Sequence, residues 1–197
     1  MRSPLAEMSA GVRRNWWAVG LRGAASLLFA IAILSLPPHA VAPLALLFTA
    51  YVAADGALAI LVATRAAQWG YRWPLLALEG SVNLAVAAGV LVWQAVAVVP
   101  LMQIATVWAV ITGGLLLAAA HRLSGSEGRW ILTLAGVVSA SWGTLLAAIG
   151  ASEMRAMGLW LIAYALTFGA TLVVLAGHWQ RRQQGSITTA ANDSRWH

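Results

Sequence analysis

Three ionisable side chains lie inside long apolar stretches of this sequence, and they are the residues whose types could do chemistry. Arg22, Asp55 and Glu79 each interrupt a separate apolar run. A guanidinium can bind two carboxylates because it is planar and presents five donors. Since an ionised group is costly among apolar atoms, such charges commonly pair with one another or mark a functional site. We therefore expect Arg22 to bridge Asp55 and Glu79.

Polar neighbours one helical turn away could support this charge cluster, by which we mean Arg22, Asp55 and Glu79. Residues four apart lie on the same face of a helix. Three polar side chains have that spacing from one of the charges, and we expect them to add hydrogen bonds: Ser26, Tyr51 and Asn83.

Three interpretations of the charge cluster are open from the residues alone. It could be a polar contact that fixes one part of the protein against another, because polar contacts between helices in membranes are common. It could be a proton-responsive site in which Glu79 or Asp55 takes up a proton and releases Arg22. It could also bind a small solute or a lipid headgroup. The flanking runs 27–34 and 85–92 offer no group along which a proton or an ion could continue.

The composition indicates that the elements around these charges lie in a bilayer. The chain has 61% hydrophobic and 9% charged residues over 197 positions, which is too apolar for a soluble domain. No segment outside the apolar runs is long enough to form a basic nucleic-acid-binding surface. Cysteine is absent, and no sequence motif of a hydrolase, a nucleotide-binding loop or a metal site is present. We expect no enzyme activity, no cofactor, no metal and no nucleic-acid partner.

Six apolar runs have the length of about 20 residues that crosses a bilayer. The predicted membrane spans are residues 16–36, 41–63, 75–93, 101–120, 130–149 and 157–177. An even number of spans requires both termini on one side. Ten arginines fall in the leader, the tail and the two loops of that side, and one falls in the three turns of the other side. The positive-inside rule therefore predicts cytoplasmic termini.

An internal repeat organises the six spans. Gly23, Gly80 and Gly136 are separated by 57 and 56 residues, and a second glycine series has the same two separations: Gly56, Gly113 and Gly169. Each unit holds two spans, so the three copies have the same orientation in the membrane. Small residues let helices approach closely in lipid, and we expect the glycines to serve packing.

The predicted fold is therefore an all-α integral membrane protein with six transmembrane helices, arranged as three parallel-repeat helical hairpins. A cytoplasmic leader (1–15) precedes the membrane domain (16–178), whose repeats are 16–65, 72–122 and 129–178. The tail from 179 to 197 is polar and is predicted to be disordered in the cytoplasm.

The spacing of these residues resembles the HdeD family of acid-resistance membrane proteins. The resemblance covers residues 15–179 and rests on three sequence groups: Trp16-Trp17 with Leu21-Arg22-Gly23, Tyr51 with Asp55-Gly56, and Arg72-Trp73 with Leu78-Glu79-Gly80. It implies a six-helix protein of the bacterial inner membrane that is linked to survival of acid stress. The third repeat departs from the pattern, since Ala135 and Phe168 occupy the positions of the charges.

The functional expectation is an HdeD-like protein linked to acid or envelope stress, acting structurally or through a pH-linked change around the charge cluster. A channel or transporter for protons or a small solute is the alternative. His39 lies in a predicted outer turn and is a candidate pH sensor, because histidine titrates near neutral pH. The expected partners are the lipid bilayer and either a second copy of the chain or another membrane protein.

Overall fold

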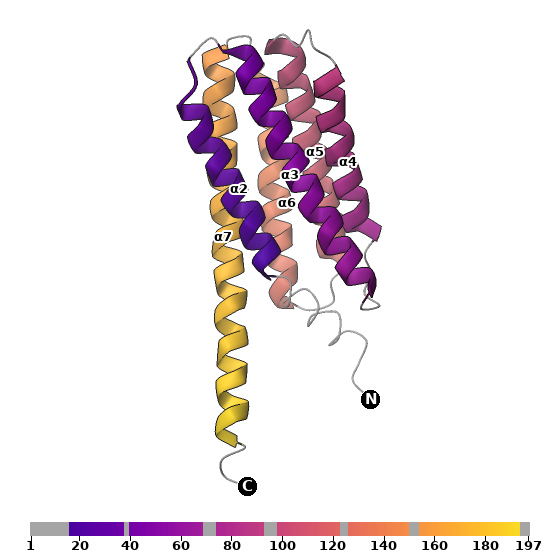
Figure 1. Cartoon of the computed structure of the whole chain (residues 1–197), viewed down its shortest axis with the longest axis vertical. Helices are drawn as coiled ribbons and strands as arrows, with labels where there is room; N and C mark the ends of the chain where they lie inside the picture. Colours follow the sequence, from indigo (N-terminus) through magenta and orange to yellow (C-terminus); the bar gives the residue numbers. More distant parts are fainter. Residues whose placement is uncertain are drawn as a thin grey trace.

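Every element of the described chain is an α-helix. The computed structural model describes residues 16–37, 40–68, 74–92, 98–122, 126–149 and 154–193. The helices are α2 (Trp16–Leu34), α3 (Val41–Gln68), α4 (Pro74–Val92), α5 (Val98–Arg122), α6 (Ser126–Ile149) and α7 (Met154–Asp193). They run alongside one another in a single bundle (Figure 1). Helices satisfy their own backbone hydrogen bonds, which is what an apolar surrounding demands.

Five of these helices are long and apolar enough to cross a membrane, which confirms five predicted spans. Their apolar stretches are Trp17–Leu34, Val41–Arg65, Pro74–Val92, Pro100–His121 and Ala156–His178. The remaining helix, α6, has a shorter apolar stretch, Leu132–Ala148. Its first four residues are Ser126, Glu127, Gly128 and Arg129, and they leave less apolar length than the predicted span had.

Local sequence signals account for several helix ends. Pro74 opens α4, where its missing N–H costs no hydrogen bond. At the end of α2 the chain tightens, because Ser35 N donates to Ala32 O (3.2 Å) and Leu36 N donates to Ile33 O (3.0 Å). Such short-range bonds use carbonyls that would otherwise lack a partner. Pro37 follows directly and cannot continue the helix.

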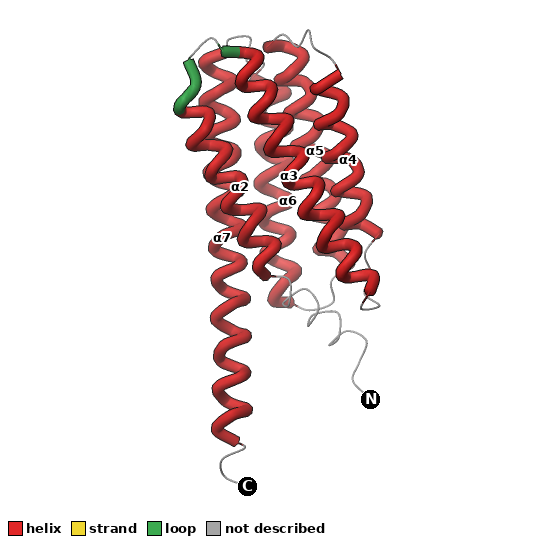
Figure 2. The backbone as a smooth tube through the Cα atoms, viewed as in Figure 1, coloured by secondary structure: helices red, strands yellow, loops and turns green. Residues whose placement is uncertain are grey.

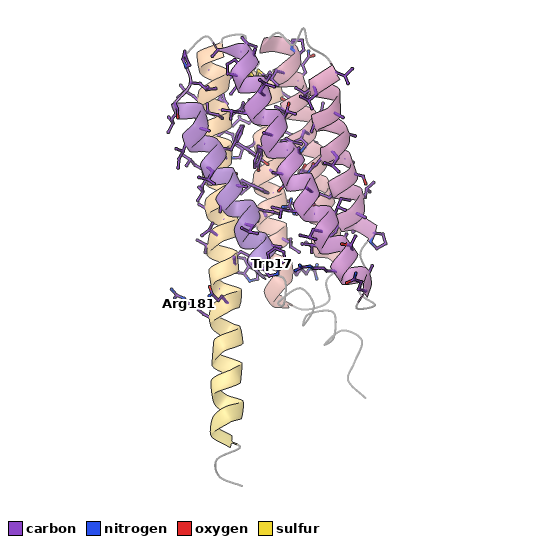
Figure 3. All side chains as sticks on the ribbon, viewed as in Figure 1. Trp17 and Arg181 are labelled. Atoms are coloured by element: carbon purple, nitrogen blue, oxygen red, sulfur yellow. The ribbon has the colours of Figure 1, made fainter. Side chains whose placement is uncertain are left out.

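Successive helices run in opposite directions through the bundle. Figure 2 shows α2 beginning and α7 leaving at the same end, which we call the termini end. Trp17 lies at this end, and Arg181 projects outward from α7 near the same level (Figure 3). The opposite end, where α2 ends at Leu34 and α3 begins at Val41, is called the far end.

The helices pair most extensively across the predicted repeats. The three largest interfaces join α5 to α6, α2 to α7 and α3 to α4. The two helices within each predicted repeat, such as α2 and α3, share far less surface. Each large interface therefore joins the second helix of one predicted repeat to the first helix of the next, and the pair α2 and α7 closes the ring.

Each of these three interfaces is built on a reciprocal pair of glycines. A Cβ atom at Gly23 would lie 2.9 Å from Gly169 O, and one at Gly169 would lie 2.9 Å from Gly23 O. Gly56 and Gly80 have the same relation at 3.0 and 2.8 Å. The third pair is Gly113 with Gly136, at 2.8 and 2.9 Å. Any side chain at these positions would push two backbones apart, so the predicted packing role of the glycines agrees with these contacts.

The apolar core is concentrated toward the far end. Its largest fully buried side chains there include Phe48, Leu44, Leu101 and Met157. On the side of the termini end, most of the buried residues are alanines, such as Ala59 and Ala120, and they are not part of the continuous core cluster. The core is therefore continuous from the far end to the middle of the bundle and not beyond.

The structure differs from the predicted disordered tail, because α7 continues to Asp193. The end of α7 is anchored in the bundle, so each further residue extends an existing helix instead of nucleating a new one. Gln and Ala residues of 179–193 favour this extension. The leader 1–15 and the candidate sensor His39 lie outside the described residues.

Candidate functional site

The three predicted charged residues come from three different helices and lie close to the termini end. Arg22 is six residues from the start of α2, and Glu79 is five residues from the start of α4. At 1.5 Å per residue these positions are ~9 and ~8 Å into their helices. Asp55 lies on α3 between them. The glycine contact of α3 with α4, one residue further along each helix, holds Asp55 and Glu79 at this shared level.

Arg22 bridges both carboxylates, as the sequence analysis predicts. Its Nε atom donates to Asp55 Oδ1 at 2.6 Å, and its Nη2 atom donates to Asp55 Oδ2 at 2.8 Å. The same Nη2 atom donates to Glu79 Oε1 at 2.5 Å. The contact with Asp55 uses the two-pronged geometry that a guanidinium offers and an ammonium group does not. The contact with Glu79 uses a single donor atom.

Asn83 and Trp108 extend the charge cluster into the bundle. Asn83 Nδ2 donates to Asp55 Oδ2 at 2.7 Å, so the Asp55 carboxylate accepts three hydrogen bonds. Trp108 Nε1 donates to Asn83 Oδ1 at 2.8 Å and fixes the orientation of that amide. Asn83 is fully buried and Trp108 nearly so, which makes each of these bonds strong in a surrounding without competing water.

The charge cluster is buried and its charges do not balance. Asp55 and Glu79 are 2% and 3% exposed, and Arg22 is 9% exposed. With both carboxylates ionised, one guanidinium faces two negative charges. A charge that lacks a full counter-charge in a low-dielectric interior costs on the order of several kcal/mol. Uptake of one proton by the site would make it neutral.

Three aromatic side chains, one from each predicted repeat, form a layer next to the charge cluster on its far-end side. We call Tyr51, Trp108 and Tyr164 the aromatic layer. The rings of Tyr51 and Trp108 meet edge to face at a centroid distance of 5.9 Å, and those of Trp108 and Tyr164 at 5.7 Å. Their separations of 57 and 56 residues match the glycine series.

Each member of the aromatic layer is paired with a buried polar residue 25 positions away. Trp108 pairs with Asn83, as described above. Tyr51 OH donates to Ser26 Oγ at 3.4 Å, and the hydroxyls of Tyr164 and Ser139 lie 3.2 Å apart. The two serines also donate to backbone carbonyls of a neighbouring helix, Ser26 to Ala165 O at 2.9 Å and Ser139 to Ala109 O at 2.8 Å.

Two of the three predicted supporting residues therefore bind elsewhere. Tyr51 contacts Ser26 instead of Asp55, and Ser26 reaches the backbone of α7 instead of Arg22. Asn83 joins the charge cluster, but through Asp55 on the neighbouring helix instead of Glu79 on its own. The reason is that close helix crossings bring groups of another helix nearer than the next turn of the same helix.

One buried hydroxyl in this region has no partner among the described residues. Thr112 is 1% exposed, and its Oγ1 atom makes no hydrogen bond there. By the repeat spacing, Thr112 on α5 corresponds to Asp55 on α3. Threonine hydroxyls in helices commonly bond the carbonyl four residues back, as Thr49 does with Ala45 O at 2.8 Å. Thr112 does not do so, which leaves its hydroxyl available to another polar group.

The termini end carries a second contact between α2 and α3. The guanidinium of Arg65 lies 5.0 Å from the centroid of the Trp17 ring. Such a cation–π contact is typical of arginine and tryptophan at a membrane boundary. In the described part of the chain, no group of three or more histidine and acidic residues is arranged to hold a metal ion.

The charge cluster and the fold have no counterpart among known proteins in our comparisons. No family model, no curated protein and no solved structure matches the chain. The resemblance to the HdeD family therefore remains a prediction from residue spacing.

Three participants in the polar contacts were not identified as site residues from the sequence: Trp108, Ser139 and Tyr164. The signal that could have found them is the repeat spacing itself. Ser26, Asn83 and Ser139 have separations of 57 and 56 residues, and each lies four residues after the Arg22, Glu79 or Ala135 position of its repeat. Applying the spacing to polar residues as well as to glycines predicts this second layer.

Proposed function

We propose that this chain is a six-span protein of the bacterial inner membrane, built from three parallel repeats, whose charge cluster adapts the bundle to acid. The three glycine pairs and the three aromatic and polar pairs share one spacing, which supports the repeats. α6 packs along α5 through Gly113 and Gly136, which supports a crossing for α6 as well. The distribution of arginine supports cytoplasmic termini.

The observation that carries the proposal is the imbalance of charge around Arg22. Asp55 binds Arg22 through two atoms and Asn83 through a third bond, whereas Glu79 receives one donor that it shares with Asp55. Protonation of Glu79 in acid would leave a neutral Arg22–Asp55 pair and remove the repulsion between the two carboxylates. The membrane part would then gain stability in acid, where other proteins lose theirs. The resemblance to the HdeD family supports acid or envelope stress as the setting.

This proposal makes a prediction about Glu79→Gln, which resembles the protonated side chain. For the wild-type protein we expect a higher melting temperature near pH 5 than near pH 7, because acid removes the excess charge. For Glu79→Gln we expect a melting temperature at neutral pH at least as high as the wild-type value at acid pH, with little dependence on pH. A gain of 1 kcal/mol corresponds to about 2–4 °C for a chain of this size. Thermal unfolding of purified protein in lipid nanodiscs measures both.

Glu153→Gln is the matched control, since Glu153 lies outside the apolar stretches, and it should keep the wild-type pH dependence. If Glu79→Gln instead lowers the melting temperature at neutral pH, the carboxylate serves only as a polar contact and the acid response is wrong.

A further inference from the structure

We propose that water and protons reach the charge cluster from the termini end only, and that the aromatic layer closes it from the far end. The inference rests on the proposed function for its role in acid. It adds that the protein responds to the compartment at its termini end and is insensitive to the pH on the other side.

The position of the charge cluster along the helices is the first observation. Arg22 and Glu79 lie ~9 and ~8 Å from the termini end of their helices. From the same residues, α2 continues for twelve residues to Leu34 and α4 for thirteen residues to Val92, which are ~18 and ~20 Å. A proton arriving from the far end would have to cross about twice the distance.

The aromatic layer is the second observation. Tyr51, Trp108 and Tyr164 are buried and in contact with one another, and their polar atoms are used by Ser26, Asn83 and Ser139. Phe48 packs edge to face against Trp108 at a centroid distance of 5.6 Å on the far-end side. The polar groups of this layer are therefore already occupied and do not offer a relay to the far end.

The core beyond the aromatic layer is the third observation. Among the described residues, the one buried polar side chain on the far-end side is Thr49, and its hydroxyl is bonded to the backbone of its own helix. The remaining buried residues there are apolar and belong to the continuous core, including Leu44, Leu101 and Met157. Apolar interiors of this kind exclude water.

The termini side of the charge cluster is built differently. The continuous core does not extend there, and the buried residues are mostly small: Ala18, Ala59, Ala63, Ala120 and Ala176. Arg22, the most exposed member of the cluster, retains 9% of its surface. The unpartnered hydroxyl of Thr112 lies at the level of Asp55 by the repeat spacing, and a water molecule would satisfy it. These features favour hydration of the cluster from this end.

The titratable and charged groups around Glu79 are few. Among the described residues they are Arg22 from α2, Asp55 and Tyr51 from α3, and Tyr164 from α7. α5 contributes Thr112 and Trp108, which do not titrate. Neither tyrosine side chain loses its proton in the acid range, so a proton that enters from the termini end has the carboxylates as its acceptors.

Single cysteines can test this directly, because the natural chain has none. Full-length Thr112→Cys is placed in sealed vesicles of both orientations and exposed briefly to Ag⁺, a small thiol-reactive ion. Labelling with a fluorescent maleimide after unfolding measures the thiols left unreacted. We expect Ag⁺ to react at least tenfold faster from the termini side. Ala105→Cys lies on the same helix, seven residues toward the far end and equally buried, and it should react from neither side.

Two exposed reference positions establish orientation and tightness of the vesicles: Gln68→Cys at the termini end and Ser35→Cys at the far end. Equal rates from both sides, a faster rate from the far side, no reaction from either side, or reaction of Ala105→Cys as fast as that of Thr112→Cys would overturn the inference. The proposed function can fail separately. In that case Glu79→Gln would not change the pH dependence of unfolding while Thr112→Cys still reacted from one side.

Discussion

At the scale of single residues, Arg22 is the side chain on which the centre of the bundle depends. It supplies every described hydrogen bond to Glu79 and two of the three to Asp55. The value of arginine here is its geometry, because two adjacent nitrogens match the two oxygens of Asp55 while one of them also reaches Glu79. A lysine would place one point charge at the same site.

Arg22→Ala should therefore be strongly destabilising at neutral pH. It leaves two buried carboxylates without a counter-charge, and breaking a buried pair in this way costs about 3–5 kcal/mol. Arg22→Lys keeps the charge but loses the two-pronged contact, so we expect an intermediate loss. Chemical unfolding in detergent micelles measures both variants.

Neutralising the carboxylates as well is the informative control for Arg22→Ala. The triple variant Arg22→Met, Asp55→Asn and Glu79→Gln carries no buried charge and should recover most of the stability. A loss as large as that of Arg22→Ala would show that packing of the arginine stem, and not its charge, stabilises the bundle.

At the scale of helices, glycine decides which elements lie together. The paired glycines place backbone against backbone at three crossings, and the polar contacts between helices follow from this proximity. Ser26 reaches Ala165 O because Gly23 and Gly169 bring α2 and α7 together three to four residues away. Ser139 reaches Ala109 O in the same way beside Gly113 and Gly136.

Substitution of Gly113 by alanine should separate α5 from α6. The added Cβ atom would lie 2.6 Å from Ala140 N and 2.8 Å from Gly136 O, which are backbone atoms that cannot turn aside. Overpacking of this kind costs about 1–3 kcal/mol. Gly89→Ala is the matched control within a helix, because its Cβ atom would meet nothing within 4 Å. Thermal unfolding should show a loss for the first variant and none for the second. Equal effects would contradict the role of the crossing.

At the scale of the whole molecule, the bundle is a ring of three helix pairs around an asymmetric centre. Two predicted repeats supply the charges, and the third supplies Ala135 and Phe168 at the corresponding positions, both buried. Phe168 stacks on Tyr164 at a centroid distance of 5.5 Å and joins the aromatic side of the centre. The charge cluster is therefore confined between the first two repeats.

This arrangement predicts the absence of proton transport across the membrane. Proteoliposomes that hold a pH-sensitive dye should show no more proton flux than vesicles without protein, because the core beyond the aromatic layer carries no polar path. Trp108→Ala, which opens that layer, is the comparison that should raise the flux. Wild-type flux above that of empty vesicles that disappears in Glu79→Gln would instead support the channel or transporter alternative.

The topology can be tested in cells. Ten arginines at the termini end predict that this end faces the cytoplasm. A fluorescent protein that folds only in the cytoplasm should be bright when fused after His197. An alkaline phosphatase, which is active only outside the cytoplasm, should be active when inserted at Pro37. The opposite pattern would reverse the orientation and with it the compartment that the charge cluster senses.

Several features of the protein follow from the amino-acid sequence alone. Long apolar runs must become helices, since only a helix satisfies its backbone within one segment in lipid. The spacing of the two glycine series marks the crossings, and the scarcity of charge makes the pairing of Arg22 with Asp55 and Glu79 the expected outcome. These are consequences of local composition and of the cost of burying charge.

The tertiary structure alone decided which helices share the large interfaces and where the polar side chains point. Lipid tails are as apolar as leucine, so the hydropathy pattern does not separate core-facing from lipid-facing positions. The pairing across predicted repeats, the donation of Asn83 to Asp55 and the closure of the aromatic layer all depend on how closely backbones approach in space. That approach is set by the glycine crossings acting together, and no single stretch of the sequence contains it.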